Sequence, residues 1–235
     1  MEKLSKSVIG ILIISLLIGI FATSCKKKKE DKNDYITESI PSSVLPDAIR
    51  ENVAELIPIY FGTTPPDLTN KDFVSSPHVM FYNSNSSNPD SVVYHSDRYI
   101  AFRYSESNGL TYYSRQWDDV EQTDIYENVA NINVTGSNNN FSYYYLTIGY
   151  PNGLYAEQST IISGTLGDDG VYNFHVAVIL LETSGNPNLE PVNSYRVLKD
   201  EDGFSQFENW LNSKSDVKPS QDISDETIFK LFRKN

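Results

Sequence analysis

The chain has few residues suited to covalent stabilisation or metal chemistry: its 235 residues include one cysteine, Cys25, and three histidines. A single thiol cannot form a disulfide within the chain, so a disulfide-stabilised scaffold is excluded. Positive charge is also scarce, because 19 Lys and Arg stand against 31 Asp and Glu, for a formal net charge of −12. Phosphate repels such a chain, so we expect no nucleic-acid partner. Only one long apolar run occurs, which excludes several helical membrane spans.

Aromatic residues, in contrast, are abundant, with 16 Tyr and 11 Phe. So many large side chains can bury surface, which excludes a disordered acidic chain. The length suits one large domain or two small ones.

The N-terminus carries the most specific pattern. Lys3 and Lys6 precede an apolar run, residues 8–21, that is shorter than the ~20 residues needed to cross a bilayer. Three small residues, 22–24, separate this run from Cys25. A positive start, an apolar stretch and a small-residue end are typical of a secretory signal peptide.

This segment resembles the signal peptide of Bacteroidota-type bacterial lipoproteins, whose lipobox ends in cysteine. The resemblance implies cleavage between Ser24 and Cys25 and a lipid on Cys25 that anchors the exported protein to the outer membrane, facing the periplasm or the cell surface. Ala22 departs from the usual Leu, Val or Ile at its position. The alternative is a plain secretory peptide or single-pass anchor with an incidental cysteine.

We expect four segments along the chain. These are a signal peptide (1–24), a lipidated cysteine with a charged flexible tether (25–40), a β domain (41–212) and a polar C-terminal tail with a short helix (213–235). The tether starts KKKKEDKND after the cysteine, without an apolar residue, so this stretch cannot pack.

Helical periodicity is confined to short stretches. Apolar residues at helical spacing behind Pro46 predict an amphipathic helix over Pro46–Ile57. Phe204, Phe207, Trp210 and Leu211 predict a short helix over Phe204–Leu211, and a last short helix carries Phe229 and Phe232.

From His78 onward apolar residues alternate with a period of two. Eight segments are predicted as strands, with a ninth at 194–199: 78–83, 91–96, 98–105, 110–117, 129–136, 141–150, 155–166 and 171–182. Turn pairs such as Asn108-Gly109 and Asp169-Gly170 indicate hairpins. The chain is therefore predicted to be mainly β, an antiparallel 8–9-stranded β-barrel with an N-terminal helix and a short C-terminal helix; the alternative is a β-sandwich.

The strand over 171–182 shows two different faces. Tyr172, Phe174, Val176, Val178 and Leu180 form the predicted inner row. The other row begins with Asn173 and His175 and ends with Ala177 and Ile179, which indicates that the far end is covered on both sides.

The N-terminal helix, the entry segment Gly62–Pro66, the hairpin-linked strands and the C-terminal helix resemble the lipocalin-like or calycin-like barrels of exported lipoproteins. The resemblance implies a non-catalytic binding protein for a small apolar or amphipathic ligand, in a cavity lined by rows such as Phe102 and Phe174. It supplies no binding residues, because the Gly-x-Trp of the first lipocalin strand is missing here.

No catalytic or nucleotide-binding motif is present, so we expect no enzyme, catalytic residue, metal ligand or cofactor. His78, His95 and His175 are widely spaced, and the acidic clusters 118–119, 168–169 and 200–202 suit turns more than calcium loops. A carboxylate pair across a cleft is invisible in sequence, which leaves a hydrolase as one alternative. A surface module that binds glycan or protein is another, because Tyr112-Tyr113, Trp117, 143–145 and Tyr150 crowd the central strands.

Overall fold

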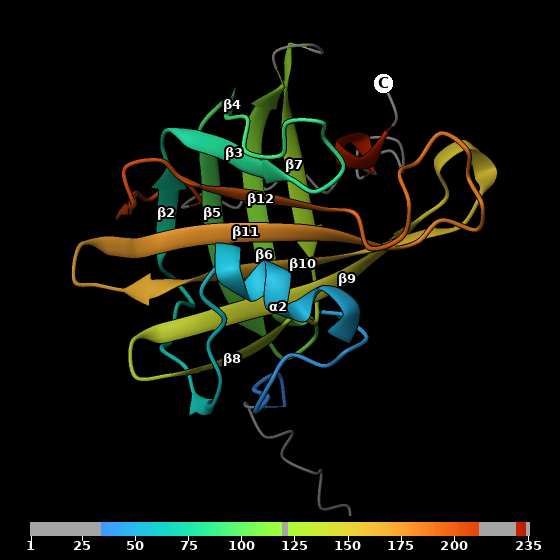
Figure 1. The fold of residues 1–235 in the computed structure, drawn as a ribbon. Coiled ribbons are helices and arrows are strands. Elements are labelled where there is room, and N and C mark those ends of the chain that lie inside the picture. Colours follow the sequence, from blue (N-terminus) through green and yellow to red (C-terminus); the bar gives the residue numbers. More distant parts are fainter. Residues whose placement is uncertain (1–33, 119–121, 212–228, 234–235) are drawn as a thin grey trace, which may run out of the picture. The chain divides into compact units, whose positions relative to one another are not determined.

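The computed structural model describes residues 34–118, 122–211 and 229–233; from Tyr35 onward they belong to one compact unit. This unit is mainly β, as predicted, and its described residues form 13 strands and one α-helix (Figure 1). The strands are β1 (Thr63–Thr64), β2 (Asp72–Ser75), β3 (His78–Asn83), β4 (Val93–His95), β5 (Arg98–Ser105), β6 (Gly109–Asp118), β7 (Thr123–Val129), β8 (Asn133–Ser137), β9 (Asn140–Gly149), β10 (Ala156–Leu166), β11 (Gly170–Glu182), β12 (Tyr195–Asp200) and β13 (Phe204–Phe207). The helices are α2 (Asp47–Leu56) and the 3-10 turns η1 (Pro151–Gly153) and η2 (Lys230–Phe232).

The strands form one hydrogen-bonded sheet, which forks at β11. Its main path runs β1-β8-β9-β10-β11-β13-β2-β5-β6-β7, and a branch leaves β11 through β12 and β3 to β4. β11 pairs with β13 over residues 170–172 and with β12 over residues 175–179, so two strands share one edge. All pairs between these strands are antiparallel except β1 with β8.

The prediction of a closed 8–9-stranded barrel is wrong. Across the described ranges the main path ends at β1 and β7, and no pairing joins these two strands. The predicted hairpins determine only which consecutive strands lie side by side. β2 and β13 instead pair with each other although they are far apart in sequence, with Phe73 opposite Phe207. β1, β2 and β7 were not among the predicted strands.

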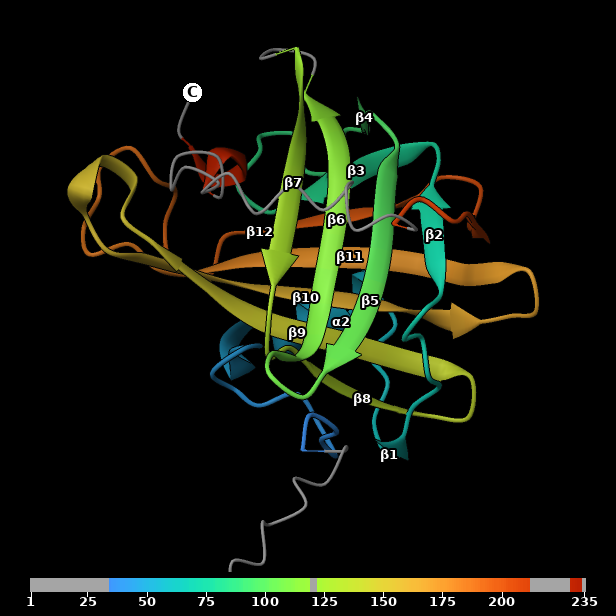
Figure 2. The same ribbon diagram turned by 180° about the vertical axis from the view of Figure 1, so that it is seen from behind.

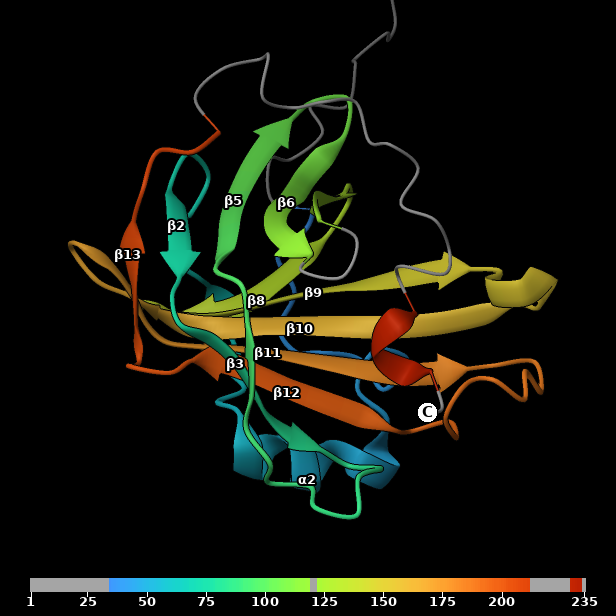
Figure 3. The same ribbon diagram turned by 90° about the horizontal axis from the view of Figure 1, so that it is seen from above.

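The sheet bends so that two groups of strands face each other. Figure 2 shows β5, β6 and β7 crossing the long strands β9 to β11 at a steep angle, and Figure 3 shows α2 on the opposite side of those long strands. The larger apolar cluster fills the space between the two groups and includes Phe73, Phe102, Tyr143, Phe174 and Val178.

The smaller cluster lies beneath α2, whose position confirms the predicted helix over Pro46–Ile57 to within one residue at each end. Its buried Ile49 and Val53 pack with Ala177 and Ile179 of β11. The far end of β11 is therefore covered on both sides, as its sequence predicted.

Two details of the predicted pattern are wrong. Tyr172, placed in the inner row of β11, is 46% exposed. The segment that begins at Phe204 forms β13 and not a helix, because pairing with β2 and β11 satisfies its backbone and buries Ser205 completely. The spacing of Phe204 and Phe207 by three residues fits a helix, so the long-range pairing overrides the local pattern here.

Residues outside the predicted β domain also pack on it. Ile36 forms a parallel bridge with Val134, and Ile40 is buried beside α2. At the other end, Phe229 and Phe232 are completely buried in the larger cluster.

Among the glycines of the described ranges, Gly136 in β8 has the closest backbone atom to an added Cβ. Its φ is +153°, and a Cβ added there would lie 2.1 Å from the carbonyl oxygen of Asn140. By contrast, a Cβ on Gly185 meets no atom within 4 Å.

Candidate functional site

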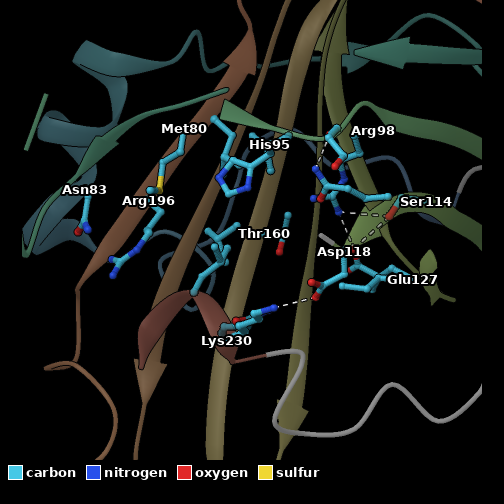
Figure 4. Close-up of a pocket in the computed structure, with 18 of the residues that line it drawn as sticks. Met80, Asn83, His95, Arg98, Ser114, Asp118, Glu127, Thr160, Arg196 and Lys230 are labelled. Carbon is cyan, nitrogen blue, oxygen red and sulfur yellow. Dashed lines mark hydrogen bonds and ion pairs between the residues drawn. The ribbon is translucent and has the colours of Figure 1, made fainter. Parts of the chain in front are cut away.

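A cavity of about 870 Å³ lies where the larger apolar cluster stops, between β5–β7 on one side and β9–β12 on the other. Met80 and His95 reach it from the branch, and the segment after η2 adds Arg233 (Figure 4). The apolar part of its wall includes Val176 and Val178 of β11 and Leu198 of β12. Most of the other lining residues are polar or charged, which distinguishes this space from the core beside it.

One side of the cavity holds a network around Arg98 of β5. Arg98 Nη2 lies 2.7 Å from Glu127 Oε2 and also donates to Ser114 Oγ at 3.2 Å. Its Nε donates to Tyr112 Oη, and Tyr145 Oη donates to the second oxygen of Glu127 at 2.8 Å. Burial lowers the pKa of Arg98, but Tyr112, Glu127 and Tyr145 together raise it above its ordinary value. Arg98 is therefore positively charged, and its charge is paired within the network.

The other side holds an ion pair between Arg196 Nη2 and Glu190 Oε1, whose side chains are only 5% and 8% exposed. Arg196 also lies 5.1 Å from the ring centroid of Phe232. Arg196 and Arg98 stand on opposite sides of the space in Figure 4.

This second pair is incompletely satisfied. Arg196 Nη1 and Glu190 Oε2 are buried without a hydrogen-bond partner among the described residues, and so is Oε1 of Gln158, another residue that lines the cavity. A buried polar atom without a partner costs about 1–3 kcal/mol. His95 Nε2 is a fourth such atom in a residue that lines the cavity. A polar group added to the cavity gains most where it can pair with these atoms.

The C-terminal segment closes one flank of the cavity. Lys230 Nζ lies 2.7 Å from Asp118 Oδ2 at the end of β6, and Leu231 lines the space. The backbone N–H of Glu190 donates to the carbonyl of Phe232 at 2.9 Å, which fixes this segment beside the Arg196 pair.

The structure brings two of the three histidines together. His78 and His95 are paired across β3 and β4 with ring centroids 6.4 Å apart, while His175 packs against Phe81 on the other face. Burial, together with the charge of Arg98, lowers the pKa of His78 and His95, so both are neutral at neutral pH. Within the described ranges, no group of three or more His, Cys, Asp or Glu side chains could hold a metal ion.

The predicted site residues divide into three groups. Ser24 and Cys25 lie outside the described residues. Phe102 stacks on Tyr143 at 4.1 Å and Phe174 packs edge-on against Phe73, so both belong to the packed core and neither lines the cavity. Trp117 does line it and is 42% exposed.

The tyrosine run 143–145 is buried on both faces of β9. Tyr143 and Tyr145 point into the larger cluster and Tyr144 into the smaller one. These aromatic residues therefore contribute mainly to the core and to the Arg98 network, and less to an exposed face.

Charged residues such as Arg98 and Arg196 were not predicted from the sequence to line a cavity. Arg98 precedes the inner row of Ile100 and Phe102 by two residues, and Arg196 stands in the same row as buried Leu198. The sequence did contain a signal for them. An arginine in line with the inward-facing apolar residues of a strand must itself be buried, and a buried charge needs a partner.

Comparison with protein-family models, curated proteins and solved structures gives no match to this chain. In the part of the chain that the structure describes, no helix has the length and apolar character needed to cross a membrane.

Proposed function

We propose that the protein is an exported, lipid-anchored binding protein whose cavity holds one small amphipathic molecule without transforming it. The observation that carries this proposal is the cavity itself. Its volume, about 870 Å³, falls within the roughly 300–1,000 Å³ of small-molecule sites. Val176, Val178 and Leu198 offer an apolar wall, and the two arginine networks offer polar ends.

The binding proposal is tested by native mass spectrometry of residues 35–235, purified without detergent from the exported protein. This unit contains the whole described sheet and both apolar clusters. We expect a bound mass that leaves on denaturation. Ile125→Trp fills the cavity from the edge strand β7, whereas Asn128→Trp adds the same ring on an exposed position of that strand. Retention of the bound mass by the Ile125 variant would place the ligand elsewhere.

The anchor proposal rests on the pattern that ends in Ser24 and Cys25. Several acyl chains on one residue supply stable attachment, at about 0.8 kcal/mol for each buried CH₂. The intact mass of membrane-extracted protein should correspond to a chain that begins at Cys25 and carries a diacylglycerol. Cys25→Ser should abolish that modification, and a wild-type chain with an unmodified cysteine would refute the anchor.

A further inference from the structure

The ion pair between Arg196 and Glu190 has a specific hydrogen-bonding deficit. One contact, Nη2 to Oε1, joins the two side chains. This leaves Arg196 Nη1, a donor, and Glu190 Oε2, an acceptor, buried without partners among the described residues. Gln158 Oε1 adds a second acceptor without a partner; it comes from β10, which β11 separates from β12, and Gln158 lines the same cavity as Arg196 and Glu190.

The charges of this pair discriminate among ligand groups. A carboxylate that approaches Arg196 also meets the negative charge of Glu190, and an ammonium group that approaches Glu190 meets Arg196. On the far side of the cavity, the positive charge of Arg98 is likewise paired with the carboxylate of Glu127. A hydroxyl group suits both partners, because it donates one hydrogen bond and accepts others without carrying charge.

The neighbouring wall suits the rest of such a molecule. Trp117 and Tyr94 line the cavity and are 42% and 64% exposed, so flat aromatic surface is available where the space opens. Aromatic rings pack against the apolar faces of a molecule while hydroxyl groups at its edge make hydrogen bonds elsewhere.

We infer that the ligand carries an uncharged polyhydroxyl group, with saccharide chemistry, bound by Arg196, Glu190 and Gln158. The inference rests on the proposed binding function and specifies its ligand class. A free saccharide and the sugar headgroup of a lipid share this chemistry.

Isothermal titration calorimetry on residues 35–235 tests the inference with a matched series below micelle-forming concentrations. Octyl β-D-glucoside, octanoate, octylamine and octanol share one chain and differ in the polar group. Octyl glucoside should bind most tightly. Methyl β-D-glucoside separates the two sources, because its binding shows that the sugar suffices, whereas binding of octyl glucoside alone shows that a lipid chain is needed; either result supports hydroxyl recognition.

Two variants test the residues. Gln158→Met should weaken octyl glucoside binding by roughly threefold to tenfold, the range of one net neutral hydrogen bond, and leave octanol unchanged. Gln206→Met makes the same replacement at an exposed position of β13 outside the cavity and should change neither affinity. Glu190→Gln removes the negative charge beside Arg196 and should shift preference toward octanoate.

Equal binding of all four octyl compounds, or tightest binding of octanoate, would overturn the inference and leave the binding function intact. Binding of none of the four would count against the proposed function itself. Octyl glucoside binding that survives Gln158→Met and Glu190→Gln unchanged would also overturn the assignment of these residues.

Discussion

Asp200 should make the protein less stable as the pH rises through the weakly acidic range. Its side chain is 1% exposed and lies where the sheet forks, at the end of β12. Oδ2 accepts hydrogen bonds from the backbone N–H of Ser76 at 3.0 Å and from Ser205 Oγ at 2.8 Å. Oδ1 is buried without a partner among the described residues. Burial, more than any neighbour, raises the pKa of Asp200 from 3.8 to about 6.

The sign follows from the two protonation states. Because the folded pKa is the higher one, the folded protein holds the Asp200 proton more tightly than the unfolded chain does. The associated stability is complete below pH 3.8 and is lost as the pH rises toward about 6. A shift of about two pKa units corresponds to roughly 3 kcal/mol.

Asp200→Asn removes the ionisation and keeps an oxygen for Ser76 and Ser205. We expect the variant to be more stable than the wild type at pH 7.5, by up to about 3 kcal/mol, with a much smaller difference at pH 4. Urea unfolding of both proteins at the two pH values measures the difference. Asp202 also raises the pKa of Asp200, and His78 lies opposite Asp200 in the sheet, so the measured difference includes the response of these two neighbours to the substitution. Asp168→Asn, at an exposed turn, is the matched control.

An equal difference at the two pH values would refute the argument, because it would show that ionisation of Asp200 is not coupled to folding. A variant that is less stable than the wild type only at pH 7.5 would refute it as well, since the charge would then be stabilising.

Three further substitutions test the core, the cavity and the backbone by urea unfolding. Phe174→Ala should cost about 3–5 kcal/mol, since this ring is completely buried; a cost below about 1 kcal/mol would contradict the packed core. Glu127→Gln should cost about 2–3 kcal/mol, because it leaves the charged and mostly buried Arg98 without its carboxylate; an unchanged midpoint would show that water replaces Glu127 freely. Gly136→Ala should cost more than about 2 kcal/mol because its methyl group would meet a backbone oxygen, while Gly185→Ala, which meets no atom, should cost less; equal costs would exclude close approach as the cause.

Sequence reasoning succeeded where the determinants were local. The predicted segments 78–83 and 98–105 coincide with β3 and β5, and Asn108-Gly109 does join β5 to β6. A period of two and a turn residue that accepts positive φ, as Gly109 does at 61°, are properties of a few adjacent residues.

It failed where distant segments decide. Nothing within Phe204–Phe207 indicates that Phe73 will pair with it, and that pairing turns an expected barrel into a forked open sheet. The cavity was missed for the same reason: Arg196 and Glu190 are near neighbours in sequence, but only the fold brings Gln158 into the same cavity and places Arg98 across from Arg196.

The fork at β11 has a consequence for the order of folding. β5, β6 and β7 are joined by short connections and can pair early, whereas β2 reaches β11 only through β13, which lies more than a hundred residues further along the chain. Closing so long a loop costs entropy before any contact compensates it. We therefore expect the pairing of β13 with β2, which completes the fork, to limit the folding rate.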